Sequence, residues 1–244
     1  FGTLKIAEIA LKNGVSDFVF ISTDKAVRPT NIMGASKRLG ELILQSLNEH
    51  YEQNSDKRFK TKFSIVRFGN VLGSSGSVIP KFRNQIKKGV PITLTHKEIT
   101  RYFMSLKEAA QLVIQAGAMA QGGEVFVLNM GEPVKIVDLA QRMIHLSGHE
   151  VKDDKHPNGD IEIVFTGLRS GEKLYEELII GDDNVEETAH PLIMQAMEHR
   201  FALAEVEQVL MELSGKSQQH DVTWLKAQFK YFVEGYKEDK TVNL

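Results

Sequence analysis

The stretch Phe18–Lys37, FVFISTDKAVRPTNIMGASK, carries most of the side chains with which this chain could perform chemistry. It opens with four apolar residues, Phe18–Ile21, which is typical of a parallel strand buried on both faces. Four polar residues, Ser22–Lys25, follow at once, and a helical pattern begins after Pro29. Because open α/β sheets bind ligands at the carboxyl ends of their strands, these polar groups are candidates for a functional site.

The predicted helix places Met33 and Lys37 four residues apart and therefore on one face. A thioether cannot exchange a proton, so acid/base work here would have to come from Thr23, Asp24 and Lys25, hereafter the triplet. On its own the triplet would suit a solvated turn equally well. The helix beyond it favours a functional site.

The whole string STDKAVRPTNIMGASKR resembles one branch of the extended short-chain dehydrogenase/reductase superfamily. Most of that superfamily carries Tyr-x-x-x-Lys on this helix, with the tyrosine as acid/base. The branch with methionine in the tyrosine position and Thr-Asp-Lys before it comprises the UDP-N-acetylglucosamine 4,6-dehydratases of bacterial polysaccharide biosynthesis. The resemblance runs from Phe1 to about Met197.

The resemblance implies NAD(P)-dependent 4,6-dehydration of a UDP-N-acetylhexosamine, such as UDP-N-acetylglucosamine. The C4 hydroxyl is oxidised to a ketone, a base removes the C5 proton, the C6 hydroxyl leaves as water and hydride returns to C6. NAD or NADP accepts and returns that hydride. The product is a 4-keto-6-deoxy sugar for capsule, lipopolysaccharide or another surface glycan.

Catalytic roles follow from this resemblance together with residue chemistry. Lys25 is the candidate base at C5, provided that its surroundings depress its pKa. Asp24 suits proton transfer at C4 through Thr23, or acid catalysis at C6, and both roles stay open. Met33 would pack against the nicotinamide, and Lys37 would bond the nicotinamide ribose.

Three further segments match the family's binding motifs, namely RFGNVLGSSGS from Arg67, TRYFMS from Thr100 and GLRSGEK from Gly167. The guanidinium of Arg169 suits a diphosphate and Glu172 suits ribose hydroxyls. The predicted cofactor-binding residues are Ile21, Ser22, Met33, Lys37, Arg67, Phe68 and Gly69. The predicted substrate-binding residues are Asn70, Val78, Lys81, Thr95, Arg101, Arg169 and Glu172.

Each of these motifs has a plainer explanation. The Gly/Ser run can be a surface loop, and R-x-G-E can be the turn at a helix start. Arg101 can pack against its aromatic neighbours with its head in water. Lys81, as a single lysine on a helix, can simply face solvent.

The predicted fold is an α/β class with a Rossmann-like parallel sheet and a small α+β substrate-binding region. No G-x-G-x-x-G occurs in the chain, although a dinucleotide pyrophosphate needs such a loop at a helix N-terminus. The sequence is therefore expected to begin in the middle of a Rossmann domain, with its N-terminal half missing. The cofactor would then be bound mainly by a part of the parent protein outside this sequence, and the 244 residues alone would be inactive.

Three regions are expected along the chain: 1–75 as the remaining NAD(P)-binding part, 76–200 as substrate-binding with an interleaved Rossmann strand at 124–129, and 201–244 as a helical tail. Residues 151–160 are predicted to form a loop, and residues 53–60 another. Predicted helices cover 4–12, 31–51, 78–88, 106–120, 136–147, 202–213 and 222–236. Predicted strands cover 18–21, 62–68, 91–95, 124–129 and 161–165.

Composition is that of an ordinary globular protein, with 42% hydrophobic and 25% charged residues. A net charge of −2 gives no sign of nucleic-acid binding, and the chain has neither cysteine nor a metal-ligand spacing of histidines. No apolar run approaches the roughly 20 residues that span a bilayer. We expect a cytoplasmic homo-oligomer, and the helical tail is also compatible with a membrane-tethered parent at the inner face of the bacterial inner membrane.

Two rival functions remain at this stage. A UDP-sugar 4-epimerase would share the cofactor, but it needs a tyrosine where Met33 stands and has no elimination step. A non-catalytic fragment that binds a UDP-sugar, or only packs in an oligomer, would account for the missing glycine loop.

Overall fold

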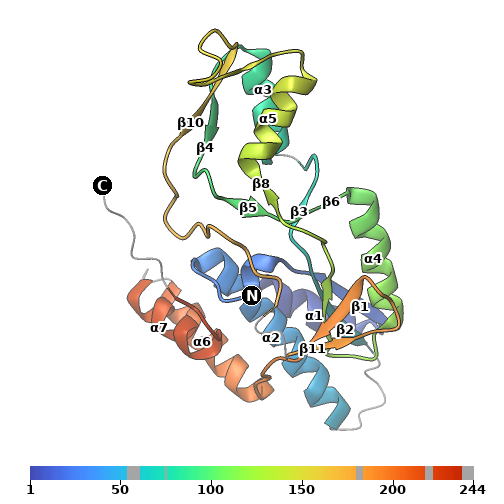
Figure 1. Ribbon diagram of the computed structural model, residues 1–244. Helices are drawn as coiled ribbons and strands as arrows, with labels where there is room; N and C mark the ends of the chain where they lie inside the picture. The colour runs from blue at the N-terminus through green and yellow to red at the C-terminus, as the bar shows by residue number, and fades with distance from the viewer. Residues whose placement is uncertain (54–60, 75, 180–183, 218–221, 238–244) are drawn as a thin grey trace. The chain divides into compact units, whose positions relative to one another are not determined.

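The computed structural model describes residues 1–53, 61–74, 76–179, 184–217 and 222–237 (Figure 1). The chain forms two compact units, each with its own core. The described residues of unit 1 lie within 1–68, 110–129 and 177–237, and those of unit 2 lie within 69–109 and 130–176.

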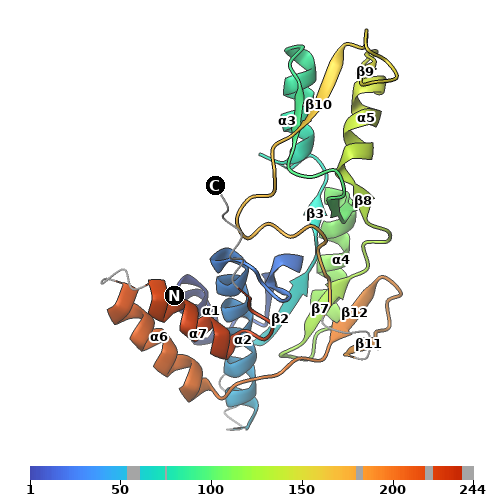
Figure 2. The same ribbon diagram turned by 60° about the vertical axis from the view of Figure 1, so that its left-hand side comes forward.

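Unit 1 is built on a five-stranded sheet in the order β1-β2-β7-β12-β11. Figure 2 labels β2, β7, β12 and β11 of this sheet. The strands β1 (Asp17–Ile21), β2 (Lys62–Arg67) and β7 (Val125–Leu128) are parallel. This confirms the predicted α/β class with a parallel sheet. Two antiparallel strands, β12 (Ile193–Ala196) and β11 (Val185–Glu187), extend the sheet beyond β7. They were not predicted, because strands of three or four residues give almost no periodic signal.

Helices cover both faces of this sheet. A Cβ on Gly40, in α2 (Ile32–Gln53), would lie 3.1 Å from the Phe20 ring. A Cβ on Gly117, in α4 (Leu106–Met119), would lie 2.8 Å from Val19. Neighbouring residues of a strand point to opposite faces, so α2 and α4 pack on opposite sides of β1. The helix α1 (Gly2–Lys12) buries Ala7 and Leu11 as its pattern predicted.

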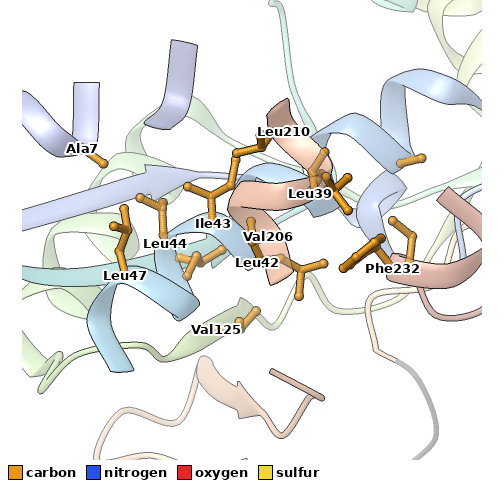
Figure 3. Packing of buried hydrophobic residues seen from close by; sticks show 14 of the residues in the cluster. Ala7, Leu39, Leu42, Ile43, Leu44, Leu47, Val125, Val206, Leu210 and Phe232 are labelled. Atoms are coloured by element: carbon orange, nitrogen blue, oxygen red, sulfur yellow. The ribbon is translucent and has the colours of Figure 1, made fainter. Parts of the chain in front are cut away.

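The C-terminal helices, predicted as a helical tail, contribute side chains to the core of unit 1. The helices α6 (Leu203–Ser217) and α7 (Val222–Phe232) pack against α2 (Figure 1). Figure 3 shows apolar side chains of α6 and α7 among those of α2, including Val206 and Phe232 beside Leu39 and Leu42. Burial of each large apolar side chain in this packing contributes about 1.5–3 kcal/mol.

Unit 2 packs two helices on a small parallel sheet. The helices are α3 (Val78–Lys87) and α5 (Ile136–Leu146), and the strands β4 (Ile92–Leu94), β10 (Ile161–Phe165) and β9 (Val151–Lys152) are ordered β4-β10-β9. Two short ladders complete the unit, β3 (Asn70–Val71) with β6 (Phe103–Met104) and β5 (Thr100–Arg101) with β8 (Val134–Lys135). The strand β9 lies where a loop was predicted, because its polar surroundings hide a two-residue strand.

The unit boundaries differ from the predicted divisions. Unit 2 begins at Gly69 and ends at Glu176, because β11 and β12 join the large sheet and return the chain to unit 1. The strand β7 belongs to unit 1, as the interleaved Rossmann strand was expected to. Most of the loop predicted at 53–60 lies outside the described residues. Within the described residues, no helix combines the length and apolar character that crossing a bilayer requires.

Candidate functional site

The triplet lies directly after β1, as a single 3₁₀ turn (η1, Asp24–Ala26) that Thr23 caps. The Thr23 hydroxyl donates to Asp24 Oδ1 at 2.8 Å, and Lys25 Nζ donates to the same oxygen at 2.8 Å. The Asp24 side chain is fully buried, whereas the Lys25 side chain keeps 28% of its surface exposed. Two proton donors, the Thr23 hydroxyl and the Lys25 ammonium, therefore converge on one carboxylate oxygen at the end of the strand.

The second carboxylate oxygen of Asp24, Oδ2, is buried and accepts no hydrogen bond from any described residue. A buried carboxylate oxygen without a donor is costly, so it marks a position that a proton, a water or a ligand hydroxyl would occupy favourably.

The first turn of α2 lies against the triplet. Asn31 caps α2, because its Oδ1 accepts a hydrogen bond from Gly34 N at 2.9 Å. A Cβ on Gly34 would lie 2.2 Å from the carbonyl oxygen of Lys25, so only glycine permits this approach. Gly34 thus allows the start of α2 to approach the backbone of the triplet closely.

Met33 and Lys37 occupy the positions that the helical spacing predicted. Met33 is 54% exposed in the first turn of α2. Lys37 Nζ lies 4.2 Å from the centre of the Phe20 ring, on β1, and is partly buried. This burial lowers the pKa of Lys37, against the opposing effect of the Glu41 carboxylate.

The predicted cofactor residues fall into two groups. Ile21 is 44% exposed at the strand end, whereas Ser22 is buried and donates its hydroxyl to Glu41. Arg67 has no exposed surface, and its guanidinium is bonded to the carboxylates of Glu41 and Glu198. A contact of the Arg67 segment with a cofactor would therefore have to come from its backbone or from Phe68 and Gly69.

A buried ion cluster, formed by Arg38, Glu41, Arg67 and Glu198, was missed by sequence reasoning. Arg38 Nη1 bonds Glu41 at 3.0 Å and Arg38 Nη2 bonds Glu198 at 2.6 Å. The only signal in the sequence was the spacing of Arg38 and Glu41, three apart on one helix, with Glu41 also four residues after Lys37. Burial by itself would raise the pKa of Glu41, but Arg67 and Arg38 more than compensate, and that pKa lies below its usual value.

All seven residues predicted to bind substrate line one cavity of about 510 Å³ in unit 2. They come from the Gly/Ser segment, α3, the residue after β4, β5 and the segment after β10. Asn70 and Glu172, which are 102 positions apart in the sequence, thus line the same cavity. Whether they hold a sugar nucleotide remains a prediction.

Inside the cavity, polar side chains fix one another. Glu172 accepts the Thr95 hydroxyl at 3.1 Å and the backbone N–H of Arg169 at 3.1 Å. Arg101 donates to two carbonyls, Thr100 O at 2.7 Å and Leu174 O at 3.3 Å, and lies 3.5 Å from Glu172. Arg101 is therefore a largely satisfied side chain that orients Glu172 at the wall.

The cavity also has an electropositive end. Burial and the nearby Arg169 both lower the pKa of Lys81, while Glu172 opposes them. The Arg169 guanidinium makes no hydrogen bond to another described residue, so its donors are available. The α3 helix begins at Val78 on this wall, and its cap residue Ser77 makes no side-chain cap bond. Free amides at a helix N-terminus favour an anion.

Residues 1–198 match the family model described as "Polysaccharide biosynthesis protein". The chain belongs to the polysaccharide biosynthesis protein family. It is 53% identical over 212 residues to the capsular polysaccharide biosynthesis protein CapD of Staphylococcus aureus, covering 87% of this chain and 33% of that protein. It is also 37% identical over 188 residues to a UDP-glucose 4-epimerase of Rickettsia canadensis, covering 75% of this chain and 49% of the epimerase.

Among solved structures, Pen from Bacillus thuringiensis is similar with a TM-score of 0.68 at 34% identity, covering 83% of this chain and 59% of that chain. The chain thus spans about a third of CapD and about three fifths of Pen. The family match and these relatives support a polysaccharide-biosynthesis member of the short-chain dehydrogenase/reductase superfamily.

The family implies a nicotinamide cofactor, and the residues of unit 1 fit its nicotinamide end. Ile21 and Met33 offer exposed apolar surface suited to a flat ring. Lys37 offers a partly buried ammonium donor suited to ribose hydroxyls. The ion cluster does not take part, since its members already bond one another.

Proposed function

We propose that this chain carries the catalytic triplet and the substrate cavity of a UDP-N-acetylhexosamine 4,6-dehydratase acting on UDP-N-acetylglucosamine. The observation that carries the proposal is the sharing of Asp24 Oδ1 by the Thr23 hydroxyl and the Lys25 ammonium. An elimination needs several proton transfers close together, and this arrangement supplies an acid, a base and a relay. Met33 supports the proposal, because methionine stands here at the position where other superfamily members use a tyrosine phenol.

Each side chain has a defined task in this proposal. Bound NAD(P) would supply the oxidation at C4 and the return of hydride at C6. The Thr23 hydroxyl passes the C4 proton to Asp24, whose unpartnered Oδ2 can accept a further hydrogen bond. Once C4 is a ketone, Lys25 in its neutral amine form takes the proton from C5, and the protonated Asp24, its hydrogen-bond partner, is the acid for the departing C6 hydroxyl.

The cavity of unit 2 would hold the nucleotide diphosphate. Burial and the positive charge of Arg169 lower the pKa of Lys81, so an anion between the two side chains would relieve a repulsion. The α3 N-terminus adds amide donors on the same wall. Glu172, oriented by Thr95 and Arg101, suits ribose hydroxyls as an acceptor.

The experiment that tests the function is a product analysis of the full-length protein with NAD(P) and UDP-N-acetylglucosamine. The expected product has lost one water, and its NMR spectrum shows a C6 methyl group and a C4 ketone or its hydrate. An unchanged mass with an inverted C4 centre would show a 4-epimerase. No turnover, with neither UDP-sugar nor NAD bound in calorimetry, would favour a non-catalytic fragment.

The 4-epimerase is the second candidate, because a relative at 37% identity carries that name. It needs an acid/base group opposite the C4 hydroxyl, where Met33 has none. The triplet has no counterpart in that simpler reaction. We therefore rank the dehydratase above it.

Replacing Arg169 by glutamine should weaken the binding of UDP about 10- to 100-fold, because a charge-assisted hydrogen bond contributes about 1.5–3 kcal/mol. Titration calorimetry with UDP measures the loss. The matched control is Arg142→Gln, which removes an exposed arginine from α5 of the same unit. Equal affinities of the two variants would remove Arg169 from the diphosphate site.

Replacing Met33 by leucine should leave the dehydration rate within about tenfold of wild type, because the two side chains have similar volume and a swap costs under about 1.5 kcal/mol. Steady-state product formation measures the effect. A loss of several orders of magnitude would mean that the thioether does more than pack against the nicotinamide.

A further inference from the structure

The buried ion cluster of unit 1 has no part in the chemistry proposed above, yet it lies next to the triplet. Glu41 is fully buried on α2, one turn after Lys37. It accepts the hydroxyl of Ser22, the residue that directly precedes Thr23. Glu41 therefore connects the helix that carries Met33 and Lys37 to the end of β1.

Arg67 connects the same cluster to the backbone of the triplet. The amide of Ser22 donates to Val66 O at 2.8 Å, and the amide of Asp24 donates to Phe68 O at 3.2 Å. These two acceptors flank Arg67, whose side chain is locked between Glu41 and Glu198. Any shift of Arg67 would therefore move the two carbonyls that align the reactive turn.

Glu198 completes the cluster from the segment that follows β12, 131 positions from Arg67. It bonds Arg67 Nη2 at 3.0 Å and Arg38 at 2.6 Å. Without it, Arg67 and Arg38 would share the single carboxylate of Glu41. Burying two such pairs is expensive, and apolar residues of similar volume often stabilise a core as well or better. Stability alone therefore does not explain why this core keeps four charged side chains in one hydrogen-bonded cluster.

We propose that Glu198 and Glu41 are positioning residues for the triplet. They hold Arg67 and Ser22, and through these the turn that carries Asp24 and Lys25. The kinetic part of this inference rests on the proposed dehydratase function, and the structural part does not.

The test uses the full-length protein with Glu198→Gln, which keeps the shape and removes the charge. Hydrogen exchange followed by mass spectrometry should show faster exchange in peptides covering 20–26, and unchanged exchange across β7. Turnover should fall by about 100-fold, as expected for an ångström-scale misplacement, with KM changed much less. Glu198→Asp, which restores the charge, should recover part of the turnover.

The matched control is Glu187→Gln, which removes an exposed glutamate from β11 of the same sheet and should change neither readout. Ser22→Ala cuts the hydroxyl link while leaving all four charges, and it should reproduce the local exchange pattern even if Glu198→Gln does not fold. Faster exchange spread evenly over β1, β2 and β7, or no change at 20–26 in either variant, would overturn the inference. If the wild-type protein dehydrates no UDP-sugar, the proposed function fails, and the exchange data still decide the positioning role.

Discussion

Replacing Lys25 by glutamine should reduce dehydration about 100- to 10,000-fold, the usual contribution of a positioned general base. Glutamine keeps a donor toward Asp24 Oδ1, which Lys25 Nζ contacts at 2.8 Å, but it cannot take a proton from C5. In D₂O the wild-type product should carry deuterium at C5. The variant should lose this incorporation, measured by proton NMR of the sugar.

The control is Lys12→Gln, an exposed lysine at the end of α1, which should leave both rate and labelling at wild-type values. Oxidation at C4 should survive in the Lys25 variant, because that step depends on Thr23 and Asp24. If deuterium still enters C5 at the wild-type rate, Lys25 is not the base and the C5 step belongs to another group.

Replacing Arg67 by methionine should destabilise unit 1 by about 3–5 kcal/mol, because it leaves buried carboxylates without their main cation. Glu41 is fully buried and Glu198 is 6% exposed, so water cannot replace the lost guanidinium. Urea unfolding followed by the fluorescence of Trp224, the chain's single tryptophan, which packs against this core, measures the change.

The comparison is Lys5→Met, which breaks the exposed Lys5–Glu8 pair of α1 and should cost less than about 1 kcal/mol. A loss for Arg67→Met no larger than that of Lys5→Met would contradict the account of the cluster.

The cluster also predicts that the stability of unit 1 falls in acid. Because the pKa of Glu41 is lowered in the folded state, the stabilising contribution of Glu41 is present above its unfolded-state pKa and is lost as pH falls through the folded value.

The sequence predicted those local features that depend on residues close together in the chain. The strand before Ser22 and the helix after Pro29 follow from apolar runs and spacing, and both exist as β1 and α2. The motif segments also named seven residues that line one cavity, although their role as substrate ligands is still a prediction.

The position of the Arg67 guanidinium could not be predicted from the sequence. Its motif suggested a place beside the nicotinamide, yet its guanidinium is buried between Glu41 and Glu198. No local pattern links Arg67 to a residue 131 positions away, since ion pairs of this kind depend on which segments the fold brings together. The helices α6 and α7 show the same limit, because their amphipathic pattern does not say which surface they cover.

The sequence by itself determined which candidate side chains follow the first strand, the strand end on which they lie and the helical spacing of Met33 and Lys37, because these depend on residues close in the chain. Only the tertiary structure decided how Asp24 is oriented, that β11 and β12 extend the sheet, and that Glu198 closes the ion cluster behind the triplet. The physical reason is that burial and pairing of charges are properties of the packed chain, and no short stretch of sequence contains them.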